Sequence, residues 1–159
     1  MRKNEIMYEA VKEALKTSSQ GIGGPFGAAI VKDDKIICVS SNSVLKDHDP
    51  TAHAEVNAIR MAGKILNTHD LSGCELYATG YPCPMCLSAI IWANIKTVYF
   101  GCTPIDADKI GFRDDFIYNY IVDLRKNSED KSLLSITQLN REDCIKLFEE
   151  YSKNSRTIY

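Results

Sequence analysis

The sequence has no excess of basic residues and no long apolar run. Its 159 residues include 19 lysines and arginines against 21 aspartates and glutamates, and like charges never form a long block. Proteins that bind nucleic-acid backbones usually carry a basic face, so this composition argues against a nucleic-acid partner. A membrane-spanning helix needs about 18 or more consecutive apolar residues. The sequence offers no such run, so no membrane partner is expected.

A secretory signal is missing as well. Residues 1–16 are rich in charge and lack the apolar stretch of a signal peptide, which predicts a cytoplasmic protein. The chain has no internal repeat and no linker, and its length suits one domain over residues 1–159. Residues 153–159 show no pattern of their own and are expected to form a C-terminal tail.

Six cysteines occur, but without a secretory signal a disulfide framework is the weaker interpretation. Most of them stand singly among apolar or mixed neighbours, and each of these is expected to be a small buried hydrophobic residue: Cys38, Cys74, Cys102 and Cys144. The other two, Cys83 and Cys86, have a spacing that suits metal chemistry.

Helical and strand-like patterns alternate along the chain. Apolar spacing and start signals predict helices over 4–17, 53–65, 84–93, 116–124 and 142–151. Runs rich in β-formers predict strands over 26–31, 35–40, 75–79, 96–101 and 133–138, the first two forming a hairpin. This order predicts an α/β fold, with a sheet covered by helices on both faces.

Two short motifs carry chemistry: His53-Ala54-Glu55 and Pro82-Cys83-Pro84-Met85-Cys86. Each begins a predicted helix, where free N–H groups and the helix dipole favour thiolates. One imidazole and two thiolates would leave the fourth tetrahedral position of zinc open for water, which is typical of a catalytic site. We therefore expect one zinc per chain, held by His53, Cys83 and Cys86.

Glu55 is close enough to the zinc-bound water to move its proton without being a ligand. Zinc lowers the pKa of bound water towards about 7, and a neighbouring carboxylate acting as acid and base contributes about 10²–10⁴-fold to rate. The pattern H-x-E followed by P-C-x-x-C is the recognised signature of zinc nucleobase deaminases.

Other interpretations of the cysteine pair stay open. It could be a redox pair, although that does not explain the His53 motif. A structural zinc site in a non-enzymatic binding module would need a fourth protein ligand, which His48 or His69 could supply. Both histidines lie in polar segments that are expected to be exposed loops.

The motifs and their surroundings resemble the cytidine-deaminase-like superfamily, and within it bacterial guanine deaminases, over about residues 21–120. The similar stretches are 21–28, 49–56, 82–87 and 111–118; the middle two are shared with tRNA adenosine deaminases. The resemblance implies a three-layer α/β/α cytidine-deaminase-like fold with a mixed central sheet, a homodimer, a nucleobase as substrate, and hydrolysis of guanine to xanthine and ammonia.

Carried over by position, the resemblance implies a purine pocket. Phe26 would stack on the base, Trp92 would wall the pocket, and the backbone N–H of Ala54 would donate to the base. Asn42 can donate and accept, so it could recognise a ring edge. On sequence alone Phe26 could instead be a core residue and Asn42 a turn residue.

Two acidic or terminal positions would complete the pocket. Asp114 would accept from the N–H groups of guanine; the family pattern Gly-Phe-x-Asp selects it over Asp115, although a solvated acidic face is the alternative. Tyr159 matches a terminal tyrosine that reaches the partner subunit's site in a tail-exchanged dimer.

One position departs from the family. Tyr81 stands where a glutamate usually precedes the zinc-binding Pro-Cys, which puts the substrate in question but not the reaction class. The rival substrates are another aminopurine, guanosine, a pterin, a triazine or cytosine. A tRNA adenosine deaminase is a further rival, disfavoured by the acidic composition.

Overall fold

The computed structural model describes residues 2–126, 132–154 and 157 of the chain. The chain divides into two compact units, residues 1–114 and 115–159. The expectation of one deaminase domain over residues 1–159 stays a prediction. Within the described residues, no helix is both long and apolar enough to cross a membrane.

A mixed four-stranded sheet forms the centre of the first unit. It consists of β1 (Gly27–Lys32), β2 (Lys35–Ser41), β3 (Cys74–Gly80) and β4 (Thr97–Cys102), in the order β2-β1-β3-β4. Strand β1 is antiparallel to both β2 and β3, whereas β3 and β4 are parallel. Positive φ angles at Asp33 and Asp34 close the β1–β2 hairpin as a tight turn that follows the twist of its strands.

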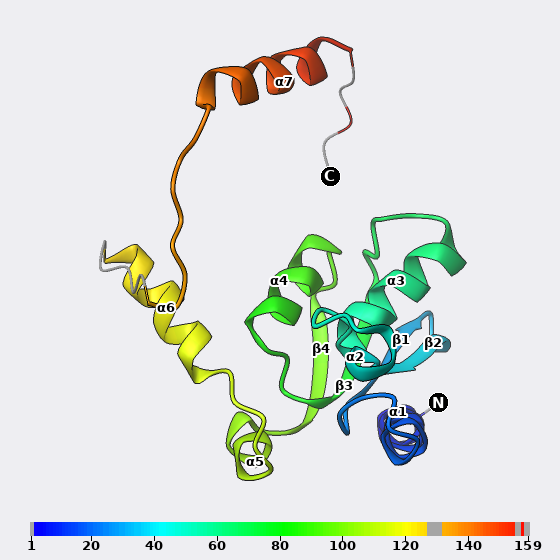
Figure 1. The fold of residues 1–159 in the computed structure, drawn as a ribbon. Coiled ribbons are helices and arrows are strands. Elements are labelled where there is room, and N and C mark those ends of the chain that lie inside the picture. Colours follow the sequence, from blue (N-terminus) through cyan, green and yellow to red (C-terminus); the bar gives the residue numbers. More distant parts are fainter. Residues whose placement is uncertain (1, 127–131, 155–156, 158–159) are drawn as a thin grey trace. The chain divides into compact units, whose positions relative to one another are not determined.

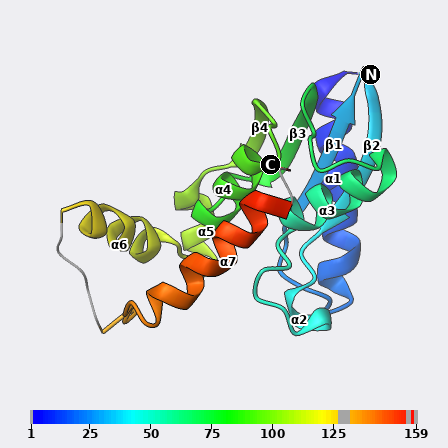
Figure 2. The same cartoon turned by 90° about the horizontal axis from the view of Figure 1, so that it is seen from above.

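Helices cover both faces of this sheet (Figures 1 and 2). Successive strand residues point to opposite faces. Ala29 and Val31 of β1 therefore pack against α1 (Lys3–Ser19) through Ile6 and Ala10. Ile30, from the same strand, belongs to the other core layer, together with α3 (Ala54–Leu66) and α4 (Pro84–Trp92). The three-layer α/β/α fold with a mixed sheet is confirmed.

Two short helices were not anticipated from the sequence. These are α2 (Val44–Asp47) and α5 (Pro104–Lys109), each too short to show a hydrophobic period. Helix α5 is nevertheless well defined by its ends. Thr103 and Asp106 exchange hydrogen bonds in a capping box at the start. At the end, Gly111, with φ +94°, donates to Asp108 and Phe112 donates to Ala107, a Schellman cap.

The second unit contains α6 (Asp115–Arg125) and α7 (Arg141–Asn154). The predicted strand at 133–138 is wrong, because residues 134–140 have no regular secondary structure and Leu134 and Ile136 are exposed. A strand needs backbone partners in a neighbouring strand, and among the described residues all ladder pairs belong to β1–β4.

Of the four cysteines that were predicted to be buried, two are buried and two are exposed. Cys38 and Cys74 are buried in the first unit, as predicted. For Cys102 and Cys144 the prediction is wrong, since both are exposed. Cys102 is the last residue of the edge strand β4, and Cys144 lies in the first turn of α7.

Candidate metal centre and the residues around it

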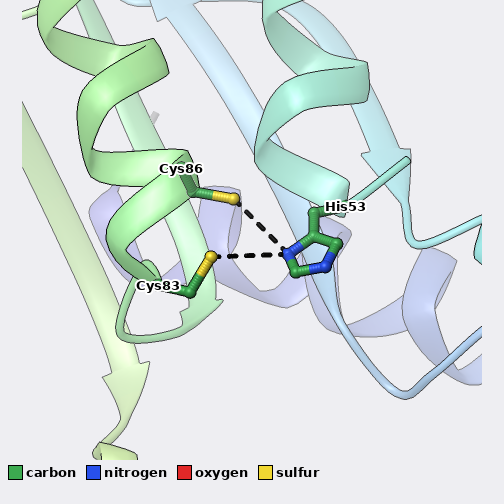
Figure 3. Close-up of side chains that lie close together, drawn as sticks. All are labelled: His53, Cys83 and Cys86. Atoms are coloured by element: carbon green, nitrogen blue, oxygen red, sulfur yellow. Dashed lines mark hydrogen bonds between the residues drawn. The ribbon is translucent and has the colours of Figure 1, made fainter. Parts of the chain in front are cut away.

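Two helix starts bring the three expected metal ligands together. His53 is the N-cap residue of α3, and Cys83 is the N-cap residue of α4, with Pro84 at the first helical position. Proline suits that position because its missing N–H would have no partner there. Cys86 lies one turn further along α4 and is buried, so both sulfurs face the imidazole across the gap between the helices (Figure 3).

The separations between these atoms fit a zinc ion. Nδ1 of His53 lies 3.6 Å from Sγ of Cys83 and 3.6 Å from Sγ of Cys86. Zinc bonds of about 2.3 Å to sulfur and about 2.0–2.1 Å to nitrogen, at a tetrahedral angle, place nitrogen and sulfur about 3.5–3.6 Å apart. Two sulfurs and one imidazole are also donors that zinc prefers. The residues therefore fit one zinc ion per chain.

The expected alternatives for a fourth protein ligand are not supported by the described residues. His53, Cys83 and Cys86 form the one cluster of potential metal ligands in the described part of the chain. His48, at the C-terminal end of α2, and His69, in the loop before β3, are both exposed and lie outside that cluster. Three protein ligands, with the fourth zinc position left to water, correspond to a catalytic rather than a structural site.

The two thiols of the cluster differ in pKa. The neighbouring Cys86 side chain lowers the pKa of Cys83 to about 4, with His53 contributing in the same direction. The Cys83 side chain, together with burial, raises the pKa of Cys86. Cys83 is thus the more acidic of the two thiols, and Cys86 is the one that has to release a proton when it becomes a ligand.

Glu55 lies in the first turn of α3, beside the three ligands. It is only 8% exposed, and the Cys86 thiol donates to its Oε2 at 3.5 Å. Burial raises the pKa of the Glu55 carboxyl above its usual value. A carboxyl group with a raised pKa can both accept and return a proton near neutral pH, which is the property of a general acid–base.

Asn42 follows the end of β2 and is 6% exposed. Its side-chain Oδ1 accepts from the backbone N–H groups of Gly24 and Val44, at 3.2 and 3.1 Å. The amide oxygen is therefore engaged within the protein, and Nδ2 is the group that can contact a ligand. Sequence reasoning expected Asn42 to donate and accept; in the structure it is available as a donor.

The loop before β1 packs tightly against Asn42. A Cβ atom at Gly23 would lie 2.2 Å from the backbone oxygen of Asn42 and 2.3 Å from Oδ1, distances that no side chain tolerates. The backbone N–H of Asn42 also donates to the carbonyl of Phe26 at 3.0 Å. The Gly-rich stretch is thus needed for close approach of two backbone segments.

Phe26 lies beside the strand end that leads to the metal loop. Its ring is 3.5 Å from the position that a Cβ of Gly80 would take, and Gly80 precedes Cys83 by three residues. The ring of Phe112 meets Phe26 edge-on, with centroids 5.0 Å apart and planes at 88°. Phe26 is half-buried and packs against the core. Its stacking on a base stays a prediction.

Phe112 is a residue that sequence reasoning missed, although it lies in the quoted stretch 111–118. The Schellman cap of α5 directs it towards Phe26, and the half-buried Asp114 follows two residues later. Asp114 therefore lies two residues after Phe112, whose ring contacts Phe26. The Gly-Phe pair after a short helix was the available signal, because glycine followed by an apolar residue is typical of this cap.

Three further residues were expected in the pocket: Ala54, Trp92 and Tyr159. Ala54 is buried at the first position of α3, where the geometry of a helix start leaves its N–H without an acceptor inside the helix. Trp92 is 73% exposed and lies at the end of α4 opposite to Cys83, so this chain alone does not bring it to the ligands. Tyr159 lies outside the described residues. The roles of all three stay predictions.

Tyr81, which departs from the family pattern, is on the strand-to-helix connection before Cys83. Its backbone N–H donates to the carbonyl of Cys102 at 2.8 Å, and its ring meets Phe100 edge-on at 5.0 Å. Both rings are partly exposed. The tyrosine thus packs along the edge strand β4, and the three metal ligands form their cluster with it in place.

Zinc binding is expected to weaken as the pH falls. The hydrogen bond to Cys83 raises the pKa of His53 above its ordinary value of 6.5. A protonated imidazole cannot bind a metal, so the contribution of His53 to the affinity is fully present above this raised pKa and is lost as the pH falls through it. Competition titrations with a zinc-binding dye, from about pH 8.5 to about pH 5.5, would measure this. A zinc dissociation constant that does not change over this range would contradict the role of His53.

Comparison with known proteins places these residues in context. The family described as "Cytidine and deoxycytidylate deaminase zinc-binding region" matches residues 1–102, which include the three ligands and Glu55. A guanine deaminase from Bacillus subtilis (strain 168) is 45% identical over 133 residues, covering 84% of this chain and 83% of that protein. A tRNA-specific adenosine deaminase from Aquifex aeolicus (strain VF5) is 45% identical over 101 residues, covering 64% and 66%.

Solved structures show the same relationship. The X-ray structure of guanine deaminase from Bacillus subtilis superposes with a TM-score of 0.90 and 38% identity, covering 100% of this chain and 99% of that one. A guanine deaminase from Nitrosomonas europaea superposes with a TM-score of 0.68 and 30% identity, covering 71% and 65%. The similarity to the first structure extends beyond residue 102, into the segment that the family description does not match.

Proposed function

Because the chain belongs to the cytidine and deoxycytidylate deaminase family of zinc-binding proteins, we propose that it is a zinc-dependent aminohydrolase that converts guanine and water to xanthine and ammonia. The observation that carries the substrate is the similarity to guanine deaminase over the whole chain, with a TM-score of 0.90. Residues 103–159, outside the zinc-binding region, contribute to that similarity.

In this reaction the bond from the purine ring to its exocyclic amine breaks and a carbon–oxygen bond forms at the same carbon. Zinc, when bound by His53, Cys83 and Cys86, supplies a water of lowered pKa as the nucleophile at neutral pH. The carboxylate of Glu55 would accept one proton of this water and deliver it to the ring nitrogen beside the attacked carbon, and would then carry the second proton of the attacking oxygen to the leaving amine, which departs as ammonia. The burial that raises the pKa of Glu55 favours the protonated form needed for that second transfer.

We propose that the base lies between the metal ligands and the ring of Phe26. Stacking on an aromatic ring contributes about 1–3 kcal/mol for comparable bases. Nδ2 of Asn42 and the backbone N–H of Ala54 would donate to acceptors on the ring, and the Asp114 carboxylate would accept from its N–H groups. Guanine carries hydrogen-bond acceptors on one edge and N–H donors on another, so a pocket with two donors and one acceptor suits it.

A tRNA adenosine deaminase is the second candidate, supported by relatives such as the Aquifex aeolicus enzyme. The similarity to a structure from work on tRNA:A34 deaminases has a TM-score of 0.62 and covers 64% of this chain. The formal charge of −2 gives an RNA backbone little to bind. Tight, salt-sensitive binding of tRNA would favour this candidate over guanine.

We further propose a homodimer in the cytoplasm. Exposed apolar side chains on α7 (Leu147, Phe148) and at the end of α4 (Ile91, Trp92) suit burial against a second copy. Trp92 and Tyr159 would then act through that contact, with tails exchanged. All six cysteines are free, and a site built on two reduced thiols suits a reducing compartment such as the cytoplasm.

The substrate proposal is tested by ammonia release from a panel of guanine, guanosine, adenine, cytosine, a pterin and a triazine. Free guanine should be turned over, and Asp114→Ala should lower its kcat/KM roughly 10- to 100-fold, because a charged hydrogen bond contributes about 1.5–3 kcal/mol. Asp115→Ala is the matched control, since it removes the neighbouring carboxylate. Turnover of another base with no effect of Asp114→Ala would reject guanine and leave the reaction class standing.

A further inference from the structure

The side-chain amide of Asn57 connects the helix of the metal ligand to the segment that holds Asn42. Asn57 lies one turn after His53 in α3 and is half-buried. Its Nδ2 donates to the backbone oxygen of Ser41 at 2.9 Å, to Oγ of Ser43 at 2.9 Å and to the backbone oxygen of Ala52 at 3.4 Å. One nitrogen thus bonds to two segments that are separate in sequence.

The three groups around this nitrogen can only accept. Carbonyl oxygens have no proton to give, and the hydroxyl of Ser43 donates its single hydrogen to Oδ2 of Asp47 at 2.6 Å. Oγ of Ser43 must therefore accept from Asn57. An amide nitrogen with two hydrogens satisfies the two short bonds, whereas a carboxylate at this position would face three oxygen atoms.

The bonds fix both sides of Asn42. Ser41 and Ser43 are its chain neighbours, so Asn57 holds the backbone directly before it and the side chain directly after it. The backbone N–H of Ser43 also donates to the carbonyl of Ala52 at 3.0 Å, which ties the same segment to the residue before His53. Asn42 in turn holds the loop of Phe26 through Gly24. Asn57 therefore links the metal-ligand helix to the segment of both proposed base-binding residues.

We propose that Asn57 is a positioning residue that sets Nδ2 of Asn42 at the right distance from the metal for the base to bind, which rests on the proposed function. The pocket is made from two parts, the starts of α3 and α4 and the end of β2 with the loop before β1. If one part shifts relative to the other, the base binds more weakly while the metal ligands stay in place.

The test uses Asn57→Leu, which removes the donors at similar volume. KM for guanine should rise about tenfold, because two hydrogen bonds that hold the segment of Asn42 are lost, with bound zinc unchanged and kcat changed less than about threefold. Asn57→Asp should raise KM further, because its carboxylate faces three oxygen atoms. Thr17→Val is the matched control: it removes the part-buried bond from Oγ1 of Thr17 to the carbonyl of Glu13, at 3.0 Å on α1, and should leave KM unchanged.

A double-mutant cycle separates positioning from general stability. If Asn57 acts through Asn42, adding Asn57→Leu to Asn42→Ala should raise KM by less than about twofold beyond Asn42→Ala alone. A fully additive effect, or an unchanged KM in Asn57→Leu, would overturn the proposal. Should Asn57→Leu fail to fold, Ser43→Ala removes one acceptor on the other side, and it must raise KM in the same direction for the proposal to stand.

Failure of the inference and failure of the proposed function give different results. The wild-type protein must release ammonia from guanine for the proposed function to hold. An active wild type whose Asn57 variants keep its KM would overturn the inference alone. If another base of the panel is the substrate, KM for that base gives the same comparison and tests Asn57 in the same way.

Discussion

Replacing Glu55 by glutamine is expected to leave zinc bound at one ion per chain and to lower kcat for ammonia release by about 10²–10⁴-fold or more. Glutamine has nearly the same shape and keeps an oxygen that can accept the hydrogen bond from Cys86. What it loses is the ability to take up and return a proton. The change therefore removes the proposed proton transfer and little else.

The position of Glu55 explains why no neighbour can replace it. It is buried beside the sulfur of Cys86, in the first turn of the helix that begins at His53. Its pKa is raised by burial, which makes the protonated form of the carboxyl easier to reach than for an exposed glutamate. The neighbouring titratable groups His53 and Cys86 are both expected to bind the metal, so neither is available for proton transfer.

Glu75→Gln provides the control for Glu55→Gln. Glu75 is half-buried at the beginning of β3, the end opposite to the metal loop, and accepts from the hydroxyl of Tyr77 at 2.9 Å. This variant should keep both zinc and turnover. Metal analysis and steady-state ammonia release on both proteins measure the difference. A Glu55→Gln protein that retained zinc and kept wild-type kcat would rule out Glu55 as the proton carrier.

The metal centre could be predicted from the sequence because its determinants are local. His53 and Cys83 each cap a helix, and the start signals Asp49-Pro50-Thr51 and Pro82 with Pro84 are visible as short patterns. The helix start then fixes where Glu55 and Cys86 point, since both lie within the first turn. Nothing from distant parts of the chain is needed except that two adjacent helices cover one face of the sheet.

The surrounding pocket could not be predicted to the same depth, because it depends on contacts between distant segments. The oxygen of Asn42 is engaged by Gly24, eighteen residues earlier, a contact that no local pattern predicts. The contact of Phe112 with Phe26 joins residues far apart in the chain and requires the caps of α5. Only the folded structure shows which hydrogen bonds are already used within the protein.

The C-terminal part illustrates a different reason for error. Leu133, Leu134 and Ile136 gave residues 133–138 the composition of a strand, yet this segment has no regular structure and is exposed in the described unit. Strand propensity reflects a fit to a half-buried pleated surface rather than a property of the backbone itself. Without a neighbouring strand, the apolar residues do not make one.

Removing one metal ligand is expected to lower ammonia release as much as Glu55→Gln does. The cause is then the loss of bound zinc rather than the loss of proton transfer. Cys86→Ala should lose zinc after dialysis against a chelator and fall to background ammonia release. With two ligands left, the metal is held too weakly to remain, and without it the pKa of water returns from about 7 towards 15.7. The proton that Cys86 releases on binding zinc should disappear from the calorimetric signal as well.

Cys38→Ala is the matched control, because Cys38 is also a buried thiol and donates to the carbonyl of Ala58 in the same helix, α3, at 3.3 Å. Both variants lose a buried sulfur, so a general packing defect would affect them alike. Added zinc should raise Tm in the wild type and in Cys38→Ala but not in Cys86→Ala, since a ligand stabilises only a protein that binds it. Zinc bound at wild-type affinity by Cys86→Ala would contradict the three-ligand site. Thiol-dependent activity that survives chelation of zinc would instead favour a redox role for Cys83 and Cys86.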